Sequence, residues 1–211
     1  MTFYIPRAFR VDDRETLERF VEAHAFGALV SAGPGGLSVS HIPFLPERKA
    51  DGNLRLLGHV ARANPHWQEL ESAPEVLAIF EGPHAYVSPG WYVSHPSVPT
   101  WNYAVVHARG KARLLPPGAL PALLDRLSRR YEDGRPAPWR MESLPSDFTP
   151  KLLEAIVGFE IAVDGLEGKF KLSQNRRRED VEGAAAALEA EGQEALAALM
   201  RDHAARPAES R

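Results

Sequence analysis

Apolar and polar residues alternate along several segments in the first half of the chain, and this period of two predicts β-strands. The pattern runs through Phe26–Ala32 and Leu37–Leu45, and the Gly-Pro-Gly-Gly sequence at 33–36 predicts a turn between them. We therefore expect these two segments to form a hairpin. Leu54–Val60 and Val76–Phe80 have the same character and predict a third and a fourth strand.

The longest alternating segment is Trp101–Leu115. Its even-numbered residues are small and mostly apolar, whereas its odd-numbered residues run from aromatic to cationic, so we expect a strand with two different faces. Segment 82–100 is rich in Pro, Gly, Ser and His and predicts a long loop. Ile156–Val163 and Gly168–Leu172 predict two further strands, separated by a turn at Asp164 and Gly165.

Apolar residues at helical spacing predict several helices, which begin near Asp12 or Asp13, Pro65, Pro117 and Thr149. The chain is rich in alanine from about Arg177, and Gly192 is expected to divide this helical segment into two. The second helix should reach about His203, and the last residues should fray.

About seven strands joined by short turns favour an antiparallel sheet, and repeated strand–helix alternation is absent. We therefore expect an α+β fold: a closed or split antiparallel β-barrel with peripheral helices and a C-terminal helical segment. The chain has 211 residues, which suits one large domain or one with a small appendage. We place the barrel domain at 1–175, with the helices of 176–211 packed on it.

Composition excludes some functions and favours others. The chain has no cysteine, which rules out disulfides, thiolate metal sites and cysteine nucleophiles. The net charge of −3 argues against a broad nucleic-acid footprint. No apolar stretch approaches the roughly 20 residues of a membrane span. The expectation is a soluble, cytoplasmic protein that does not interact with membranes.

Segment Gly58–Trp67 is the strongest candidate for a binding site, because a predicted strand runs directly into a predicted helix there. Asn64 is a favoured N-cap, and Pro65 is preset for the first helical position. The start of a helix offers unpaired N–H groups that suit an anion such as phosphate, and Arg62 and His66 add side-chain donors there. The same residues also suit an ordinary capped turn with a surface arginine.

Other motifs give little support to a specific chemistry. The chain has no dinucleotide-binding glycine fingerprint, no nucleophile elbow, no paired-histidine zinc motif and no helix-turn-helix with a basic recognition helix. His41, His59 and His107 lie on predicted strands, but carboxylates that would complete a metal site are scarce nearby, so no metal is expected. No catalytic acid, base or nucleophile can be named.

Seven short blocks of residues form an ordered set along the chain. The blocks are Phe3–Pro6, His41–Phe44, Gly58–Trp67, Phe80–Pro89, Val98–Tyr103, Ile156–Ile161 and Gly168–Asn175. Each block alone is weak as a signal, but the ordered set is specific. It resembles, block by block and in the same order, the PaiB family, described as FMN-binding negative transcriptional regulators.

The resemblance implies a split barrel shared with flavin reductases and pyridoxine-phosphate oxidases, and a homodimer with FMN at the subunit interface. It implies that Arg62, Asn64 and His66 hold the FMN phosphate. The other candidates for cofactor contact are Ser40, His41, Trp101, Asn102, Lys169 and Lys171. Each of these also has a structural interpretation, as a core, interface or strand-end residue.

Four functions remain open at this point. The resemblance favours an FMN-binding regulator, although no DNA-reading element supports a DNA partner. A flavin-dependent oxidoreductase is the main alternative, because the flavin itself carries the reactivity. A haem-binding protein would need an axial ligand, for which His84 and His107 are candidates. A protein module that has lost its cofactor is the fourth.

Overall fold

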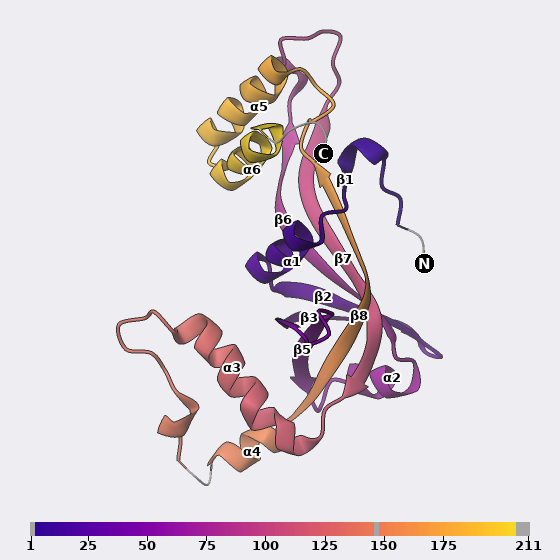
Figure 1. Ribbon diagram of the computed structural model, residues 1–211, viewed down its shortest axis with the longest axis vertical. Helices are drawn as coiled ribbons and strands as arrows, with labels where there is room; N and C mark the ends of the chain where they lie inside the picture. Colours follow the sequence, from indigo (N-terminus) through magenta and orange to yellow (C-terminus); the bar gives the residue numbers. More distant parts are fainter. Residues whose placement is uncertain (1–2, 146–147, 206–211) are drawn as a thin grey trace. The chain divides into compact units, whose positions relative to one another are not determined.

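The computed structural model describes residues 3–145 and 148–205, and these residues fold into eight strands and six α-helices. The strands form one sheet in the order β3-β2-β6-β7-β8-β5-β4, with β1 paired to β8 (Figure 1). The strands are β1 Arg10–Val11, β2 Phe26–Gly33, β3 Gly36–Pro43, β4 Leu45–Arg48, β5 Leu54–Ala61, β6 Glu75–Val87, β7 Thr100–Leu114 and β8 Ile156–Lys171. The α-helices are α1 Arg14–Ala23, α2 His66–Ser72, α3 Leu120–Glu132, α4 Phe148–Glu154, α5 Arg178–Ala190 and α6 Glu194–Ala205.

The chain divides into two compact units, which are described separately below. The first unit contains Met1–Phe20, Phe80–His107 and Leu166–Arg211, and the second contains Val21–Ile79 and Ala108–Gly165. Strands β6, β7 and β8 each contribute residues to both units. The expected division at residue 175 stays a prediction.

The predicted hairpin is present as β2 and β3, which pair antiparallel from Phe26 opposite Pro43 to Gly33 opposite Gly36. Because side chains alternate between the faces of a strand, the hairpin has two different surfaces. One surface is buried and includes Leu29, Ser31 and Ser40. The other is exposed and apolar.

Strand β7 confirms the alternation that the sequence predicts. Its even-numbered residues from Asn102 to Ala112 are buried, and the odd-numbered ones are partly or fully exposed. The sequence therefore identified both the strand and its buried face.

The end predicted for β6 is wrong, because the strand continues from Phe80 through Gly82 and Pro83 to Val87. Only the rest of the expected loop is irregular, apart from the short 3-10 helix η2 at Pro89–Trp91. Gly and Pro here do not interrupt the strand, so local composition overstated the length of the loop.

The turn predicted at Asp164 and Gly165 is also wrong, because β8 runs without interruption from Ile156 to Lys171. A Cβ placed on Gly165 would lie 2.8 Å from an Nη atom of Arg109. Glycine at this position lets the Arg109 guanidinium pass close over the strand. Gly165 is therefore a site where a side chain passes close to the backbone of the strand, and the chain does not turn there.

The helices largely follow the predicted pattern. Asp13 caps α1, since its Oδ2 accepts a hydrogen bond of 2.8 Å from the N–H of Thr16. Helices α5 and α6 lie side by side and are separated at Gly192, whose φ is +78° (Figure 1). In the second unit, Leu123 and Leu127 of α3 pack against Leu45 and Leu57. The expected fraying concerns 206–211, which lie outside the described residues.

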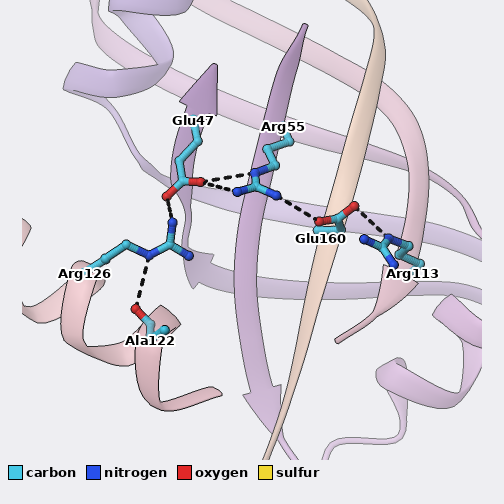
Figure 2. A network of polar contacts seen from close by, with 6 residues as sticks. All are labelled: Glu47, Arg55, Arg113, Ala122, Arg126 and Glu160. Carbon is cyan, nitrogen blue, oxygen red and sulfur yellow. Dashed lines mark hydrogen bonds and ion pairs between the residues drawn. The ribbon is translucent and has the colours of Figure 1, made fainter. Parts of the chain in front are cut away.

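An alternating series of charges crosses four neighbouring strands of the second unit (Figure 2). Glu160 on β8 is 4% exposed and accepts hydrogen bonds from Arg113 Nε at 2.7 Å and Arg55 Nη1 at 3.4 Å. Arg55 also donates to Glu47 at 2.8 Å, and Glu47 pairs with Arg126 of α3. Burial alone would raise the pKa of Glu160, but the hydrogen bond and charge of Arg113, with the charge of Arg55, lower it below its usual value.

Candidate functional site

The first cluster of predicted site residues surrounds the buried imidazole of His66 in the second unit. Its Nδ1 lies 2.8 Å from the hydroxyl oxygen of Ser40, and its Nε2 lies 3.0 Å from that of Ser31. Asn64 donates from Nδ2 to the Ser40 oxygen at 2.9 Å, and its Oδ1 accepts a bond of 3.1 Å from the N–H of His66. The fold thus brings Ser40, Asn64 and His66 together in one hydrogen-bonded cluster.

A carboxylate completes the cluster. Glu69 accepts hydrogen bonds from Ser31 at 3.0 Å and from Ser38 at 2.8 Å. These two serine bonds lower the pKa of Glu69, and burial lowers the pKa of His66, which favours a neutral imidazole. Neither Glu69, Ser31 nor Ser38 was singled out from the sequence. The signal was present in the alternation of the hairpin, which puts all three serines on one face, and in the helical spacing of His66 and Glu69.

Arg62 is exposed and lies on the same turn, with partners of its own. Its Nε donates to the carbonyl of Glu154 at 2.6 Å, and its Nη2 donates to the carbonyl of Ile156 at 3.2 Å. Within residues 3–145 and 148–205, Nη1 has no acceptor. The guanidinium is therefore held along one edge, and its other edge is available to an anion.

The helix that follows is short. It begins at His66, one residue later than predicted, and spans seven residues. His41, the remaining second-unit candidate, is exposed on the opposite face of β3 from Ser40. Arg62 is therefore the residue of this turn that can bind an anion. The side chains of Asn64 and His66 form their hydrogen bonds within the cluster.

The first unit contains a cavity of about 410 Å³ with aromatic walls. Trp101 is 55% exposed there, and its ring meets the edge of Tyr86 at a centroid distance of 6.3 Å. The lining residues are Glu81, Gly82, His84, Trp101, Tyr103, Ala104 and Val105. Its volume and mostly apolar walls suit a planar aromatic ligand.

Lys169 reaches over the same aromatic region. Its Nζ lies 5.5 Å from the ring centre of Tyr103, 5.6 Å from that of Tyr4 and 6.0 Å from that of Phe3. Lys171, two residues later on β8, donates to the hydroxyl of Thr100 and, at 2.6 Å, to the carbonyl of Trp101. Both predicted lysines therefore lie beside the start of β7.

Asn102 lies on the other face of β7 and is fully buried. Its Nδ2 donates to Ser173 at 2.9 Å and contacts the sulfur of Met200 at 3.4 Å. These partners hold the amide inside the first unit. Its predicted contact with a flavin stays a prediction.

The two histidines considered for haem also belong to the first unit. His84 is exposed at the 410 Å³ cavity, with Nδ1 3.2 Å from the carbonyl of Gly82. His107 stacks on Phe3 with ring centres 3.8 Å apart, and burial lowers its pKa. Across the part of the chain that the structure describes, no three His, Asp or Glu residues are grouped to hold a metal ion. None of the described helices combines the length and the apolar character needed to cross a bilayer.

Comparisons with known proteins identify the family and the fold. Residues 3–165 match a family described as "Putative FMN-binding domain". The "Protease synthase and sporulation protein PAI 2" of Bacillus subtilis is 40% identical over 181 residues, which cover 84% of each chain. An uncharacterized protein of Emericella nidulans is 32% identical over 220 residues, covering 85% of this chain and 87% of its own.

Two solved structures share the fold at low sequence identity. The FAD and heme binding protein of Mycobacterium smegmatis has a TM-score of 0.59 at 19% identity, covering 77% of this chain and 73% of its own. The flavocytochrome Anf3 of Azotobacter vinelandii has a TM-score of 0.58 at 17% identity, with 79% and 72% covered. The fold is therefore the α+β split barrel expected from the sequence.

The residues present fit a flavin nucleotide in two respects. An arginine with one free edge suits a phosphate, and an aromatic cavity of about 410 Å³ suits a planar ring. Because the family match spans residues 3–165 and the Bacillus relative is 40% identical over 84% of both chains, this protein belongs to the PaiB family of FMN-binding domains, whose cofactor is FMN.

Proposed function

We propose that this protein binds FMN with Arg62 as the main ligand of the phosphate group. One observation carries the proposal: two main-chain carbonyls fix the Arg62 guanidinium and leave Nη1 available. A guanidinium held in this way loses little side-chain freedom when an anion binds. The remaining donors can form charge-assisted hydrogen bonds to phosphate oxygens.

Asn64 and His66 have a positioning role in this proposal. The turn on which Arg62 lies is held by three hydrogen bonds. They run from the N–H of His66 to Asn64, from Asn64 to Ser40, and between Ser40 and the ring of His66. Ser40 also has a positioning role, because its hydroxyl is hydrogen-bonded to the ring of His66. His41 remains a candidate for contact with the ribityl chain, because it is exposed.

Independently of Arg62, we propose that the aromatic cavity of the first unit can hold an isoalloxazine ring. Trp101 and Tyr103 supply apolar walls, and Lys169 brings a positive charge toward the same rings. A cation near a flavin favours its reduced, anionic form, so Lys169 would also tune the cofactor. Asn102 and Lys171 remain candidates for contact with the flavin.

We also propose that the protein is a homodimer. The exposed face of the β2–β3 hairpin carries His41 and an apolar patch, here called the apolar hairpin face, which consists of Phe26, Val30, Leu37 and Val39. Three of these side chains are more than half exposed: Phe26 by 64%, Leu37 by 73% and Val39 by 56%. Val30 continues this face to Leu77 on β6. A contiguous apolar sheet face of this kind is typical of a protein interface, and a second copy of the chain is the partner that the resemblance implies.

The regulatory role that the resemblance implies is also a proposal, and direct binding to DNA is its weakest part. A flavoprotein can transmit the redox state of its cofactor without reading DNA. An electrophoretic shift with promoter DNA at low salt tests direct binding, since phosphate contacts are strongest there. Bleaching of the flavin absorbance by NADH or NADPH would instead favour an oxidoreductase.

The FMN proposal is tested by titrating FMN and riboflavin into the apoprotein and following flavin fluorescence. Arg62→Ala should weaken FMN binding by about 1.5–3 kcal/mol, the range for a hydrogen bond to a charged group. Riboflavin lacks the phosphate, so its affinity should not change, which also shows that the variant is folded. Arg19→Ala, which removes an exposed arginine of α1, is the control. An Arg62→Ala protein that binds FMN as tightly as wild type would contradict the assignment.

A further inference from the structure

Three cations gather at the end of β8 in the first unit without an acidic partner. They are Lys169, Lys171 and Arg176, and none of them forms an ion pair with any carboxylate among residues 3–145 and 148–205. Burial and then the charges of Lys169 and Arg176 lower the pKa of Lys171, so the cations repel one another. A bound anion would relieve this repulsion.

The neighbouring carboxylate, Asp180, interacts with Arg176 through its charge but forms no ion pair with it. Its Oδ1 accepts hydrogen bonds of 2.8 Å from the N–H groups of Val93 and Ser94. These main-chain bonds, and then the charge of Arg176, lower the pKa of Asp180, and the bonds fix the loop after η2. Arg176 is held differently, over the ring of Tyr92 at 4.6 Å and by a bond of 3.2 Å to Ser97.

The backbone is strained at the same place. Ser173 has a φ of +65°, and no other residue except glycine has a positive φ in the described part of the chain. It is buried, and its hydroxyl contacts Tyr92 at 3.3 Å and Asn102 at 2.9 Å. Strain of this kind persists where the surroundings impose it, and it is concentrated at ligand sites.

A small cavity lies within these residues. Its volume is about 100 Å³, equivalent to about three waters at ~30 Å³ each, which suits one tetrahedral oxyanion. The lining residues are Phe9, Tyr92, Val98, Thr100, Asn102, Lys171, Ser173, Asn175 and Arg176.

We propose that this cavity, here called the Lys171–Arg176 pocket, binds a phosphate group. The ammonium of Lys171 uses two of its three donors within the protein, and the guanidinium of Arg176 uses one of its five. The free donors supply charge-assisted hydrogen bonds, while Asn102 and Ser173 form a rigid polar wall. Stacking on Tyr92 fixes the plane of the Arg176 guanidinium. The side chain therefore loses little conformational freedom when an anion binds.

The Lys171–Arg176 pocket is distinct from the phosphate ligand proposed at Arg62. Lys171, Ser173 and Arg176 all follow residue 165, where the match to the FMN-binding family ends. This pocket and the aromatic cavity have no lining residue in common. The phosphate can belong to FMN or to a separate molecule, and the chemistry of recognition is the same.

The proposal is tested by titrating inorganic phosphate into the protein and measuring binding by calorimetry. Wild type should bind, and Lys171→Gln and Arg176→Gln should each weaken binding by tenfold or more, since each removes a charged donor. Arg178→Gln makes the same change of charge next to the pocket without lining it, and should bind like wild type. The melting temperature shows whether each variant is folded. Because Arg176 is only partly buried, its variant keeps the test decisive if Lys171→Gln does not fold.

Repeating the titration with saturating FMN identifies the source of the phosphate. If FMN abolishes phosphate binding, and Lys171→Gln or Arg176→Gln weakens FMN but not riboflavin, the pocket holds the tail of FMN and the assignment to Arg62 fails. If phosphate binds equally well with FMN present, the pocket serves a second phosphate-bearing molecule. The proposal is overturned if wild type shows no phosphate binding and both variants keep wild-type affinity for FMN. It is also overturned if Arg178→Gln loses as much phosphate affinity as the two pocket variants.

Discussion

The Nδ1 atom of His66 lies 2.8 Å from the hydroxyl oxygen of Ser40, and the surrounding contacts determine which of the two donates. Ser31 gives its only hydroxyl proton to Glu69, so its oxygen can only accept from Nε2 of His66. In the neutral form, which burial favours by lowering the pKa, His66 is therefore the tautomer protonated at Nε2. Its Nδ1 is then an acceptor, and Ser40 donates to it while accepting from Asn64.

This arrangement makes stability depend on pH through His66. Because burial lowers its pKa, the unfolded chain binds the proton more readily, and stability is lost as pH falls below the unfolded value of about 6.5. A neutral replacement, His66→Gln, should remove the contribution of His66 to the pH dependence of the free energy of unfolding, which is at most about 1.4 kcal/mol per pH unit. The advantage of wild type over His66→Gln in free energy of unfolding should therefore shrink between pH 7.5 and 5.5.

Urea unfolding at several pH values measures this difference. Leu70→Ala, which destabilises the same helix α2 without removing a titrating group, should keep the wild-type dependence on pH. Parallel curves for wild type and His66→Gln would show that the imidazole contributes nothing to the pH dependence.

The second prediction concerns Glu160 in the charge series of Figure 2. Its carboxylate is buried and bonded to Arg113 and Arg55, so Glu160→Gln should lower the free energy of unfolding at pH 7 by about 1.5–3 kcal/mol. Since its pKa is lowered in the folded state, this stability is present above the unfolded value of about 4.3 and is lost as pH falls through the folded value. Chemical denaturation at pH 7 and pH 3 should show a smaller difference at the lower pH.

The control for Glu160 is an ion pair on the surface of α1. Glu15 and Arg19 are 71% and 61% exposed, and Glu15→Gln should change stability by less than about 1 kcal/mol. Equal losses in the two variants at pH 7 would mean that burial of Glu160 has no energetic consequence.

The third prediction uses two glycines with opposite surroundings. A Cβ on Gly110 would lie 2.2 Å from the carbonyl oxygen of Ala162 on the neighbouring strand, and this main-chain atom cannot move aside freely. Gly110→Ala should therefore destabilise the protein by about 1–3 kcal/mol or more. Gly118 has open space at the same position, so Gly118→Ala should be neutral or slightly stabilising. Thermal unfolding of the two variants makes the comparison, and similar melting temperatures would contradict it.

The fourth prediction tests the homodimer. Val39 is exposed at the centre of the apolar hairpin face, opposite Val30, so Val39→Glu would bury a charge in any interface there. Sedimentation should show a dimer for wild type and a monomer for the variant. Val98→Glu, which changes a 67% exposed residue elsewhere, is the matched control. A Val39→Glu protein that remains a dimer would exclude this face as the interface.

Much of the fold could be predicted from the sequence, because alternation and turn residues act locally. The two faces of β7 follow from a period of two, and the division between α5 and α6 follows from the positive φ that Gly192 allows. The same local pattern misread Gly165, since a glycine that admits Arg109 cannot be told from a glycine that makes a turn.

The candidate site was predictable only in part. The strand-to-helix segment with Arg62, Asn64 and His66 could be found from the sequence because its residues are neighbours along the chain. Ser31 reaches His66 and Glu69 only because β2 and α2 pack together, and Arg176 comes near Lys171 only because the chain turns sharply at Ser173. Sequence alone determined which strands and helices form, since backbone propensity and side-chain period depend on near neighbours. Only the tertiary structure decided which charges and hydroxyls meet, because strand register and packing bring together residues that lie far apart in the chain.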